Sequence, residues 1–284
     1  MPWVASPIAD EVRPAARVLA MAGHLLSKRG YQLEVEDRFE TEELDQQLWL
    51  PHHLPQWSSR EQSAARYRVD SGQRLLIERD QQPWCAEFDG RTRVSSLQTG
   101  VFSGPVGSHV GQHHFRRDLR VREAQPAERL YTPQYGLFEA RASAVADPAN
   151  MVALWMIGYE DEPQHSAEIC IFETFGRDVG RQTAVVGMGI HPFADPALAD
   201  DFSQQPLSID ARQPHDYSIE WLPGRVDYFV DGRLVKTSNQ APDYPMQFML
   251  GIYEFQDGEV LPSPATAYPK EFVVERFAGY RQSA

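Results

Sequence analysis

Short runs of aliphatic, aromatic and β-branched residues, separated by turn residues, dominate this sequence from Tyr31 onward. Many short strand-like segments with few helical ones predict an all-β sandwich or barrel. One run, residues 151–157 (MVALWMI), is apolar throughout and indicates a strand buried on both faces at the centre of a sheet. The other segments expected to form strands are 33–39, 75–77, 135–142, 167–175, 183–190, 216–221, 226–230, 246–253 and 272–277.

Two dipeptides mark tight turns between neighbouring strand segments. Pro223-Gly224 separates residues 216–221 from 226–230, and Asp231-Gly232 follows directly after Val230. An Asp-Gly pair between apolar runs is a strong short-range signal for a β-hairpin, because both central residues must adopt positive φ. The sequence therefore predicts antiparallel pairing in this region.

The first thirty residues differ from the rest of the chain. Residues 18–26 (VLAMAGHLL) read as a short amphipathic helix, with Pro14 in its first turn and Gly30 closing it. This segment follows acidic residues and lacks the basic opening and small-residue cleavage site of a secretion signal. We expect an N-terminal helical extension over residues 1–30 and a β-domain over 31–284. A cytoplasmic location is favoured, with secretion as the alternative.

The formal net charge of −13 restricts the expected partners. A strongly negative protein repels phosphate backbones and anionic membrane surfaces. No segment is long and apolar enough to predict a membrane-spanning helix. Neutral ligands such as uncharged glycans are not penalised by this charge, so the sequence favours a neutral ligand over nucleic acid or membrane.

The segment 167–175 (AEICIFETF) places two carboxylates in an otherwise apolar strand. Such placement is costly unless the polar side of the strand lines a cleft. In a regular strand Glu168 and Cys170 share a face, whereas Glu173 points the other way. A β-bulge at Ile171-Phe172 would return Glu173 to the shared face. The alternative is a half-exposed strand carrying two solvated glutamates.

With the bulge, the two glutamates behave as neighbours four strand steps apart, a span of roughly 13 Å along the backbone. Side chains that lean together can approach the ~5–5.5 Å carboxyl separation of retaining glycosidases, as opposed to the ~6.5–9.5 Å of inverting ones. One carboxylate then attacks the anomeric carbon, and the other protonates the leaving oxygen.

The motif Glu168-Ile-Cys-Ile-Phe-Glu173 resembles the catalytic signature of glycoside hydrolase family 16, the laminarinase and lichenase group. The resemblance continues in order along residues 31–280. The segments that carry it are 135–141, 153–156 (ALWM), 215–221 (HDYSIEW), 226–232 (VDYFVDG) and 245–250. It implies a β-jelly-roll sandwich of two antiparallel sheets, of the concanavalin A-like lectin/glucanase fold.

The resemblance also implies roles for particular residues. Glu168 takes the place of the nucleophile and Glu173 that of the general acid/base. Trp155 corresponds to a sugar-stacking platform on the cleft floor, with core packing as the alternative. His191 corresponds to a substrate-facing histidine one strand over, with a structural or surface histidine as the alternative.

Cys170 departs from the family pattern, which has an aspartate between the two glutamates. A thiol is a weak donor, and with a pKa near its usual value of about 8.5 it is largely neutral at pH 7. We expect Cys170 to offer a weak S–H bond to Glu168, and the missing negative charge to lower the pKa of Glu173. The alternative is a buried apolar residue in a site that has lost this chemistry.

The remaining candidates are weaker. Trp57 and Trp84 lie in early segments expected to be loops that border the cleft or pack on the sandwich edge. The doublets His52-His53 and His113-His114 lack carboxylates at metal-binding spacing and are interpreted as loop residues. Two cysteines, Cys85 and Cys170, cannot form a disulfide framework for this chain. We expect no metal and no cofactor.

The leading functional hypothesis is an endo-acting, retaining β-glycanase. One alternative is a lectin-like glycan-binding protein on the same fold, and another is a transglycosylase in which a sugar hydroxyl replaces water. The sequence does not distinguish β-glucans from galactans, because loops set that choice on this fold.

Overall fold

The computed structural model describes residues 30–256 and 268–283, so the helix expected over residues 18–26 lies outside the described part. The described residues form strands with few helices. The helical elements are η1 (Pro55–Trp57), α2 (Ala86–Asp89) and η2 (Gly176–Asp178). The strands are β1 (Tyr31–Asp37), β2 (Arg66–Val69), β3 (Gln73–Ile77), β4 (Arg93–Gln98), β5 (Gly100–Val101), β6 (Glu128–Arg129), β7 (Gly136–Ser143), β8 (Asn150–Gly158), β9 (Glu168–Phe175), β10 (Ala184–His191), β11 (Ser203–Leu207), β12 (His215–Leu222), β13 (Arg225–Val230), β14 (Arg233–Ser238), β15 (Met246–Glu254) and β16 (Lys270–Gln282).

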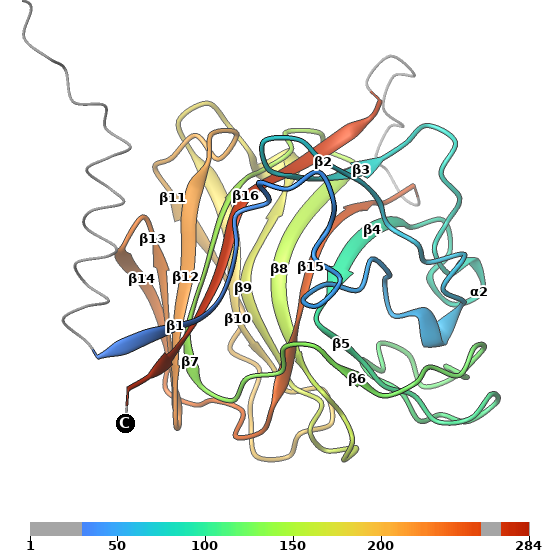
Figure 1. Ribbon diagram of the computed structural model, residues 1–284. Coiled ribbons are helices and arrows are strands. Elements are labelled where there is room, and N and C mark those ends of the chain that lie inside the picture. The colour runs from blue at the N-terminus through green and yellow to red at the C-terminus, as the bar shows by residue number, and fades with distance from the viewer. Residues whose placement is uncertain (1–29, 257–267, 284) are drawn as a thin grey trace, which may run out of the picture.

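Two large antiparallel sheets form a sandwich (Figure 1). The eight-stranded sheet has the order β14-β13-β12-β7-β16-β3-β2, with β1 also paired to β16. The six-stranded sheet has the order β11-β10-β9-β8-β15-β4. The predicted fold class, an all-β sandwich of two antiparallel sheets, is confirmed.

The predicted local features are also found. Strand β8 is buried along its whole length between β9 and β15, as the apolar run 151–157 predicts. Asp231 and Gly232 both have positive φ, 49° and 72°, in the turn between β13 and β14. Gly224, with φ 71°, makes the turn between β12 and β13.

A dry core fills the space between the two sheets. Its members are large apolar side chains such as Phe138, Phe172, Trp221, Phe248 and Phe277, each at most 1% exposed. The rings interlock, with Phe248 packing edge-on against Phe138 at 5.0 Å and Phe277 at 4.9 Å. One face of the six-stranded sheet packs against this core. We call the opposite face, which points away from the eight-stranded sheet, the cleft face.

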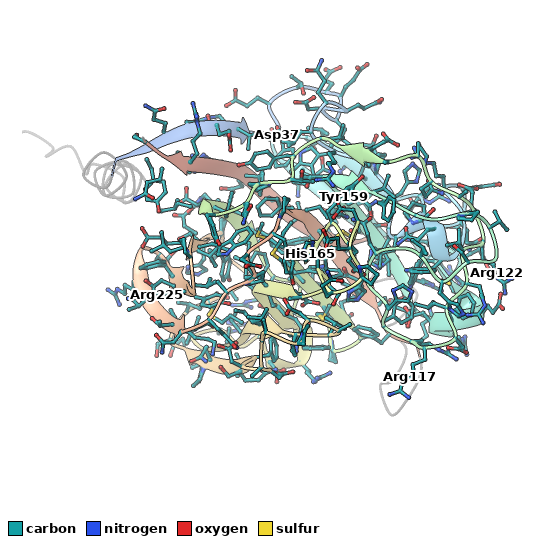
Figure 2. The ribbon with its side chains drawn as sticks, turned by 90° about the horizontal axis from the view of Figure 1, so that it is seen from below. Asp37, Arg117, Arg122, Tyr159, His165 and Arg225 are labelled. Carbon is teal, nitrogen blue, oxygen red and sulfur yellow. The ribbon has the colours of Figure 1, made fainter. Side chains whose placement is uncertain are left out.

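The loops gather on one side of the molecule. η1, α2, β5 and β6 lie beside the β4 edge of the six-stranded sheet (Figure 1). Arg122, in the loop between β5 and β6, lies at the opposite end of the molecule from Arg225, which begins β13 (Figure 2). These loops form a second apolar cluster against the cleft face, which includes Trp57, Trp84, Phe88, Val94 and Met249.

The chain ends of the described part meet. β1 pairs with the last strand, β16, from Tyr31 opposite Gln282 to Asp37 opposite Phe277. The β-fold therefore begins at the first described strand. Among the described residues, no helix has the length and apolar character needed to cross a membrane.

Candidate active site

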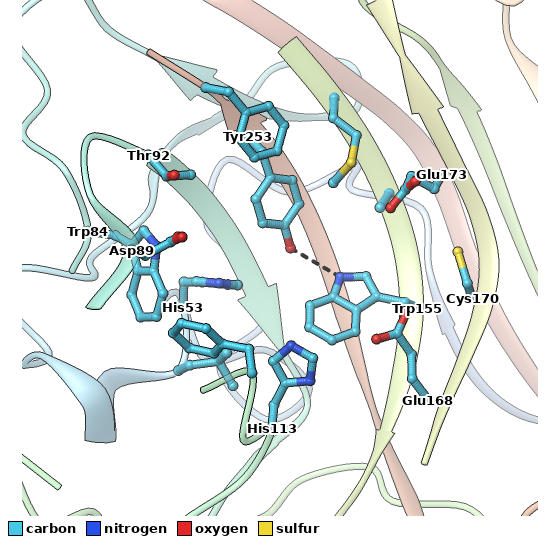
Figure 3. A pocket seen from close by; sticks show the side chains of 15 residues that line it. His53, Trp84, Asp89, Thr92, His113, Trp155, Glu168, Cys170, Glu173 and Tyr253 are labelled. Atoms are coloured by element: carbon cyan, nitrogen blue, oxygen red, sulfur yellow. Dashed lines mark hydrogen bonds between the residues drawn. The ribbon is translucent and has the colours of Figure 1, made fainter. Parts of the chain in front are cut away.

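Strand β9 presents different side chains on its two faces. Ile169, Ile171 and Phe172 enter the core between the sheets. Glu168, Cys170 and Glu173 line a pocket on the cleft face (Figure 3). The strand sits two places from one edge of its sheet, so its outward side chains lie on the floor of the cleft.

A β-bulge makes this arrangement possible. On the β8 side, Trp155 is opposite Cys170 and Leu154 is opposite Phe172, which leaves Ile171 without a partner. The register with β10 slips at the same place, between the pairs Gly189–Cys170 and Gly187–Glu173. The predicted bulge at Ile171-Phe172 is confirmed, and it brings Glu173 to the face of Glu168.

On the β8 side, the two residues opposite Cys170 and Glu173 are one large aromatic residue and one small residue. Trp155 lies opposite Cys170 and Ala153 lies opposite Glu173. The indole of Trp155 is 7% exposed and lines the pocket, and its Nε1 donates a hydrogen bond to the Tyr253 hydroxyl at 3.1 Å. The ring is thus held in one orientation at the pocket surface, as a stacking platform requires.

On the other side, β10 presents glycine to the glutamates. Gly189 and Gly187 lie opposite Cys170 and Glu173. A Cβ at Gly187 would collide with the ring of Phe202, and one at Gly189 would come within 2.6 Å of the Phe202 Cα. Glycine is therefore required at both positions, because Phe202 folds over β10 beside the glutamates.

His191 ends β10 directly opposite Glu168. Its Nδ1 lies 2.9 Å from Oδ2 of Asp200, and its ring stacks on Phe202 with centroids 4.7 Å apart. Burial raises the pKa of Glu173, and the neighbouring imidazole of His191 opposes that rise. The structure thus places His191 beside the pair of glutamates.

Loops from three parts of the chain complete a cavity of about 250 Å³ around these residues. His53 and Leu54 come from the segment before η1. Asp89 ends α2, and Trp84 and Thr92 flank this helix. His113 and Phe115 come from the loop between β5 and β6. Met151, Tyr253 and Phe255 complete the lining. In Figure 3 the labelled loop residues, among them His53, Trp84 and His113, face the β9 glutamates across Trp155 and Tyr253.

Burial sets the protonation of the two glutamates. It raises the pKa of Glu168 to about 8, with smaller contributions from the negative charges of Glu173 and Asp200. Burial also raises the pKa of Glu173, opposed by the charges of His191 and Arg177. The pair therefore retains at least one proton at neutral pH.

Cys170 behaves differently from the expectation. Its thiol donates to the backbone carbonyl oxygen of Gly187 at 3.7 Å, so the expected S–H bond to Glu168 is wrong. The reason is the register, which places Gly187 and Gly189 of β10 beside this position. Cys170 is 1% exposed, and burial together with both glutamate charges raises the pKa of the thiol well above its usual value. It stands between the glutamates as a neutral group.

The two early tryptophans are placed differently. Trp84 lines the pocket, and its Nε1 donates a hydrogen bond to Oδ2 of Asp89 at 2.6 Å. Trp57 does not line this pocket: it is fully buried, and its Nε1 donates to the Gln112 carbonyl at 2.9 Å. Its ring packs against Gly111 and His114 instead, so it supports the loops.

Sequence reasoning missed His53, His113, Tyr253 and Phe202 as residues at the site. Burial lowers the pKa of His53 and of His113 to about 3, so both imidazoles are neutral. The histidine doublets were visible in the sequence, but nothing local indicates that one member of each reaches the cleft. Among the described residues, no group of three His, Cys, Asp or Glu side chains forms a candidate metal site.

Comparisons with known proteins bear on the family and the fold. Residues 128–265 match the model of Glycosyl hydrolases family 16. None of the curated proteins compared with the chain matches it. Among solved structures, a GlcNAcα1-4Gal releasing endo-β-galactosidase from Clostridium perfringens is 26% identical, with a TM-score of 0.74. The match covers 89% of this chain but 63% of that protein, so this chain spans less than two thirds of its length.

Two laminarinases share the fold at lower identity. The catalytic domain of the endo-1,3-beta-glucanase from Thermotoga petrophila RKU-1 is 16% identical, with a TM-score of 0.62, and the match covers 89% of this chain and 99% of that one. The laminarinase from Rhodothermus marinus is 19% identical, with a TM-score of 0.59 and coverage of 89% and 98%. The match over residues 128–265 and the shared jelly-roll sandwich make this chain similar to the glycoside hydrolases of family 16.

Proposed function

We propose that the protein is a retaining endo-β-glycanase that hydrolyses a neutral β-linked polysaccharide of the glucan or galactan type. One observation carries the proposal: a bulge in β9 brings Glu168 and Glu173 to the same face, beside a fixed tryptophan in a pocket. Two carboxyl groups flanking one sugar linkage are what double displacement needs.

In the first step, a carboxylate oxygen of Glu168 attacks the anomeric carbon while the bond from that carbon to the leaving oxygen breaks. Glu173 gives its proton to the leaving oxygen. In the second step, Glu173 takes a proton from water, the water oxygen bonds to the anomeric carbon, and Glu168 leaves as a carboxylate. The configuration at the anomeric carbon is retained, because it is inverted twice.

The protonation of the two glutamates bears on which of them is the nucleophile and which is the general acid/base. One shared proton is the state that double displacement uses, and the raised pKa values of both glutamates support it. The first step of the reaction needs the shared proton on Glu173. Protons redistribute within such a coupled pair when a ligand contacts it. Neither carboxylate is hydrogen-bonded to another described residue, so substrate contacts decide where the proton resides.

The substrate class follows from charge and shape. The chain carries a net charge of −13, and the pocket holds Asp89, Glu168 and Glu173 beside two neutral histidines. Anionic sugars are disfavoured there. The relative at 26% identity is named an endo-β-galactosidase and the more distant ones are named laminarinases, which is why both galactans and glucans are included.

The test is reducing-end release from β-1,3-glucan, mixed-linkage glucan and β-galactans. We expect one polymer to be cleaved by the wild type and not by Glu168→Gln. Early products followed by NMR should show the β-anomer first. A 2-fluoro glycosyl inactivator should label the peptide carrying Glu168, whereas a label on Glu173 would reverse the two roles. A folded wild type that cleaves none of the polymers would contradict the proposal.

One observation favours a second candidate, a glycan-binding protein without turnover. Cys170 replaces the acidic residue of the family motif and donates to a backbone carbonyl instead of either glutamate. Calorimetric titration with oligosaccharides of the same polymers separates the two cases. Binding without any product, in the wild type and in Cys170→Asp alike, would support the binding protein.

A further inference from the structure

The cleft face is closed on one side of the glutamates. From β9 the floor passes over Trp155 on β8 to β15 and then to β4, in sheet order. Beyond Trp155 the floor is covered: Met249 on β15 and Val94 on β4 are at most 1% exposed and pack with the loops around η1 and α2. A sugar chain cannot lie on side chains that are already buried by protein.

Four rings form the boundary of this covered region, and we call them the wall: His53, Trp84, Phe115 and Tyr253. His53 stands between Trp84, with ring centroids 4.6 Å apart, and Tyr253, at 5.5 Å, and it meets both rings edge-on. Phe115 contacts Trp84 at 6.0 Å. All four line the cavity that contains the glutamates, and His53, Trp84 and Tyr253 lie across it from β9 (Figure 3).

The wall is fixed by its contacts with the sheet and loops. The ring of Tyr253 folds back over β15, where a Cβ at Gly251 would lie 3.1 Å from it, and its hydroxyl accepts the hydrogen bond from Trp155. Trp84 is held by Asp89, at 2.6 Å. Trp84 and His53 are 2% and 4% exposed. Side chains packed this tightly do not move aside for a polymer without loss of the second apolar cluster.

One edge of the cavity is bounded as well. His113, in the left-handed conformation with φ 57°, packs against Trp155 at 4.9 Å and against Phe193 at 5.0 Å. Its backbone N–H donates to the buried carboxylate of Glu160, which itself has φ 57°. Two non-glycine residues in this conformation cost free energy, so their contact holds the loop in a defined position.

The opposite side of the glutamates is accessible. Beyond β9 the floor is formed by Gly187 and Gly189 with Phe202 over them. The side chains of His191 and Asp200 there are 32% and 61% exposed, and Phe193 is 44% exposed. A glycan can therefore extend across β10 but not across β15.

We propose that the cleft is blind, so that the protein cleaves at a fixed short distance from a chain end and releases one short neutral oligosaccharide per turnover. This inference rests on the retaining hydrolysis proposed above, and it changes the position of cleavage from internal linkages to a linkage near a chain end. The cavity of about 250 Å³ lies below the ~300–1,000 Å³ typical of pockets for drug-sized ligands, which suits the end of a glycan and not a polymer segment. The neutral His53 and the Thr92 hydroxyl at its blind end suit an uncharged sugar.

The experiment follows product sizes over time on the polymer that the wild type cleaves among β-1,3-glucan, mixed-linkage glucan and β-galactans. A blind cleft gives a single short product from the earliest time point, while the viscosity of the polymer falls slowly. A ladder of product lengths with an early loss of viscosity would overturn the inference but leave the proposed function intact. Failure to cleave any polymer would count against the proposed function itself. The wild-type result requires no variant to fold.

Variants that each remove one ring of the wall provide a second test. Phe115→Ala removes a partly exposed ring of the wall, and Trp84→Ala removes a buried one. We expect longer products to appear in both, at a level at least several-fold above the wild type. Val110→Ala is the matched control, because Val110 lies in the same loop as Phe115 but is 48% exposed and outside the cavity. An unchanged single product in both wall variants, with thermal unfolding showing folded protein, would also overturn the inference.

Discussion

The two faces of β9 lie in different surroundings. On the core face Ile169, Ile171 and Phe172 are at most 1% exposed and contact only apolar side chains of the two sheets. On the cleft face Glu168 and Glu173 are partly buried in a polar and aromatic pocket, with no hydrogen-bond partner among the described residues. The core face is closely packed without a ligand, whereas the cleft face leaves two carboxylates without a partner among the described residues.

This difference shows how one strand can hold two destabilising carboxylates and still be stable. A partly buried carboxylate without a partner is destabilising, and two of them close together are more so. The apolar contacts on the other face of the same strand compensate for that cost. At the bulge two consecutive residues, Ile171 and Phe172, point into the core. The alternation of side chains between the core face and the cleft face therefore shifts by one residue there.

The largest expected effect is on activity, from changes to the cleft face. Glu173→Gln should lower kcat/KM by roughly 10²–10⁴-fold, because the general acid/base is lost, and it should not lower Tm. Its neighbour Thr174 is the matched control: it is buried on the core face, and its hydroxyl has no hydrogen-bond partner. Thr174→Val should keep full activity and raise stability by about 1 kcal/mol. Equal activity of wild type and Glu173→Gln would contradict the assigned role.

The next largest effect is on stability, from changes to the core face. Phe172→Ala should lower the free energy of unfolding by about 3–5 kcal/mol, because it leaves a cavity between the sheets where Phe172 contacts Tyr217 and Phe272. Urea unfolding measures the loss. At a temperature where the variant is folded, its KM should stay near that of the wild type. A loss below 1 kcal/mol would show that this face contributes little.

Much of this comparison was predictable from the sequence. The alternation of residues 167–175, with one slip, predicted both the bulge and the shared face of the glutamates, because a strand has a period of two. The apolar run 151–157 predicted a central strand. These features are local, and local patterns survive folding when burial on one face enforces them.

The wall and the β10 side were not predictable in the same way. His53, Trp84, Phe115 and Tyr253 come from segments up to two hundred residues apart in the sequence, and only the packing of loops against β15 brings them together. Trp57 and Trp84 looked alike as loop tryptophans, yet one supports the loops and the other lines the pocket. Burial of a loop side chain depends on tertiary contacts that no local period encodes.

A smaller effect concerns the pH dependence of stability. In the folded protein the pKa of Glu168 is raised from its ordinary value of 4.5 to about 8. The folded state then binds more protons than the unfolded state between these values, so this residue's contribution to stability is lost as pH rises through them. In Glu168→Gln this loss is absent. The free energy of unfolding of the variant, relative to that of the wild type, should therefore increase from pH 4 to pH 9 by on the order of a few kcal/mol, and the difference in Tm should increase with it. A constant difference in Tm across this range would contradict it.

The smallest expected effect comes from the position between the two glutamates. Cys170 faces both carboxylates as a neutral thiol. An aspartate there adds a negative charge, which favours keeping the shared proton on the pair. The basic limb of the kcat/KM profile in Cys170→Asp should therefore move to higher pH than in the wild type. Cys170→Asn has the shape of aspartate without its charge, and its basic limb should stay where the wild type has it. If the limbs of the aspartate and asparagine variants coincide, charge at this position does not control the proton that the glutamates share, and the pKa of the pair is set by burial alone.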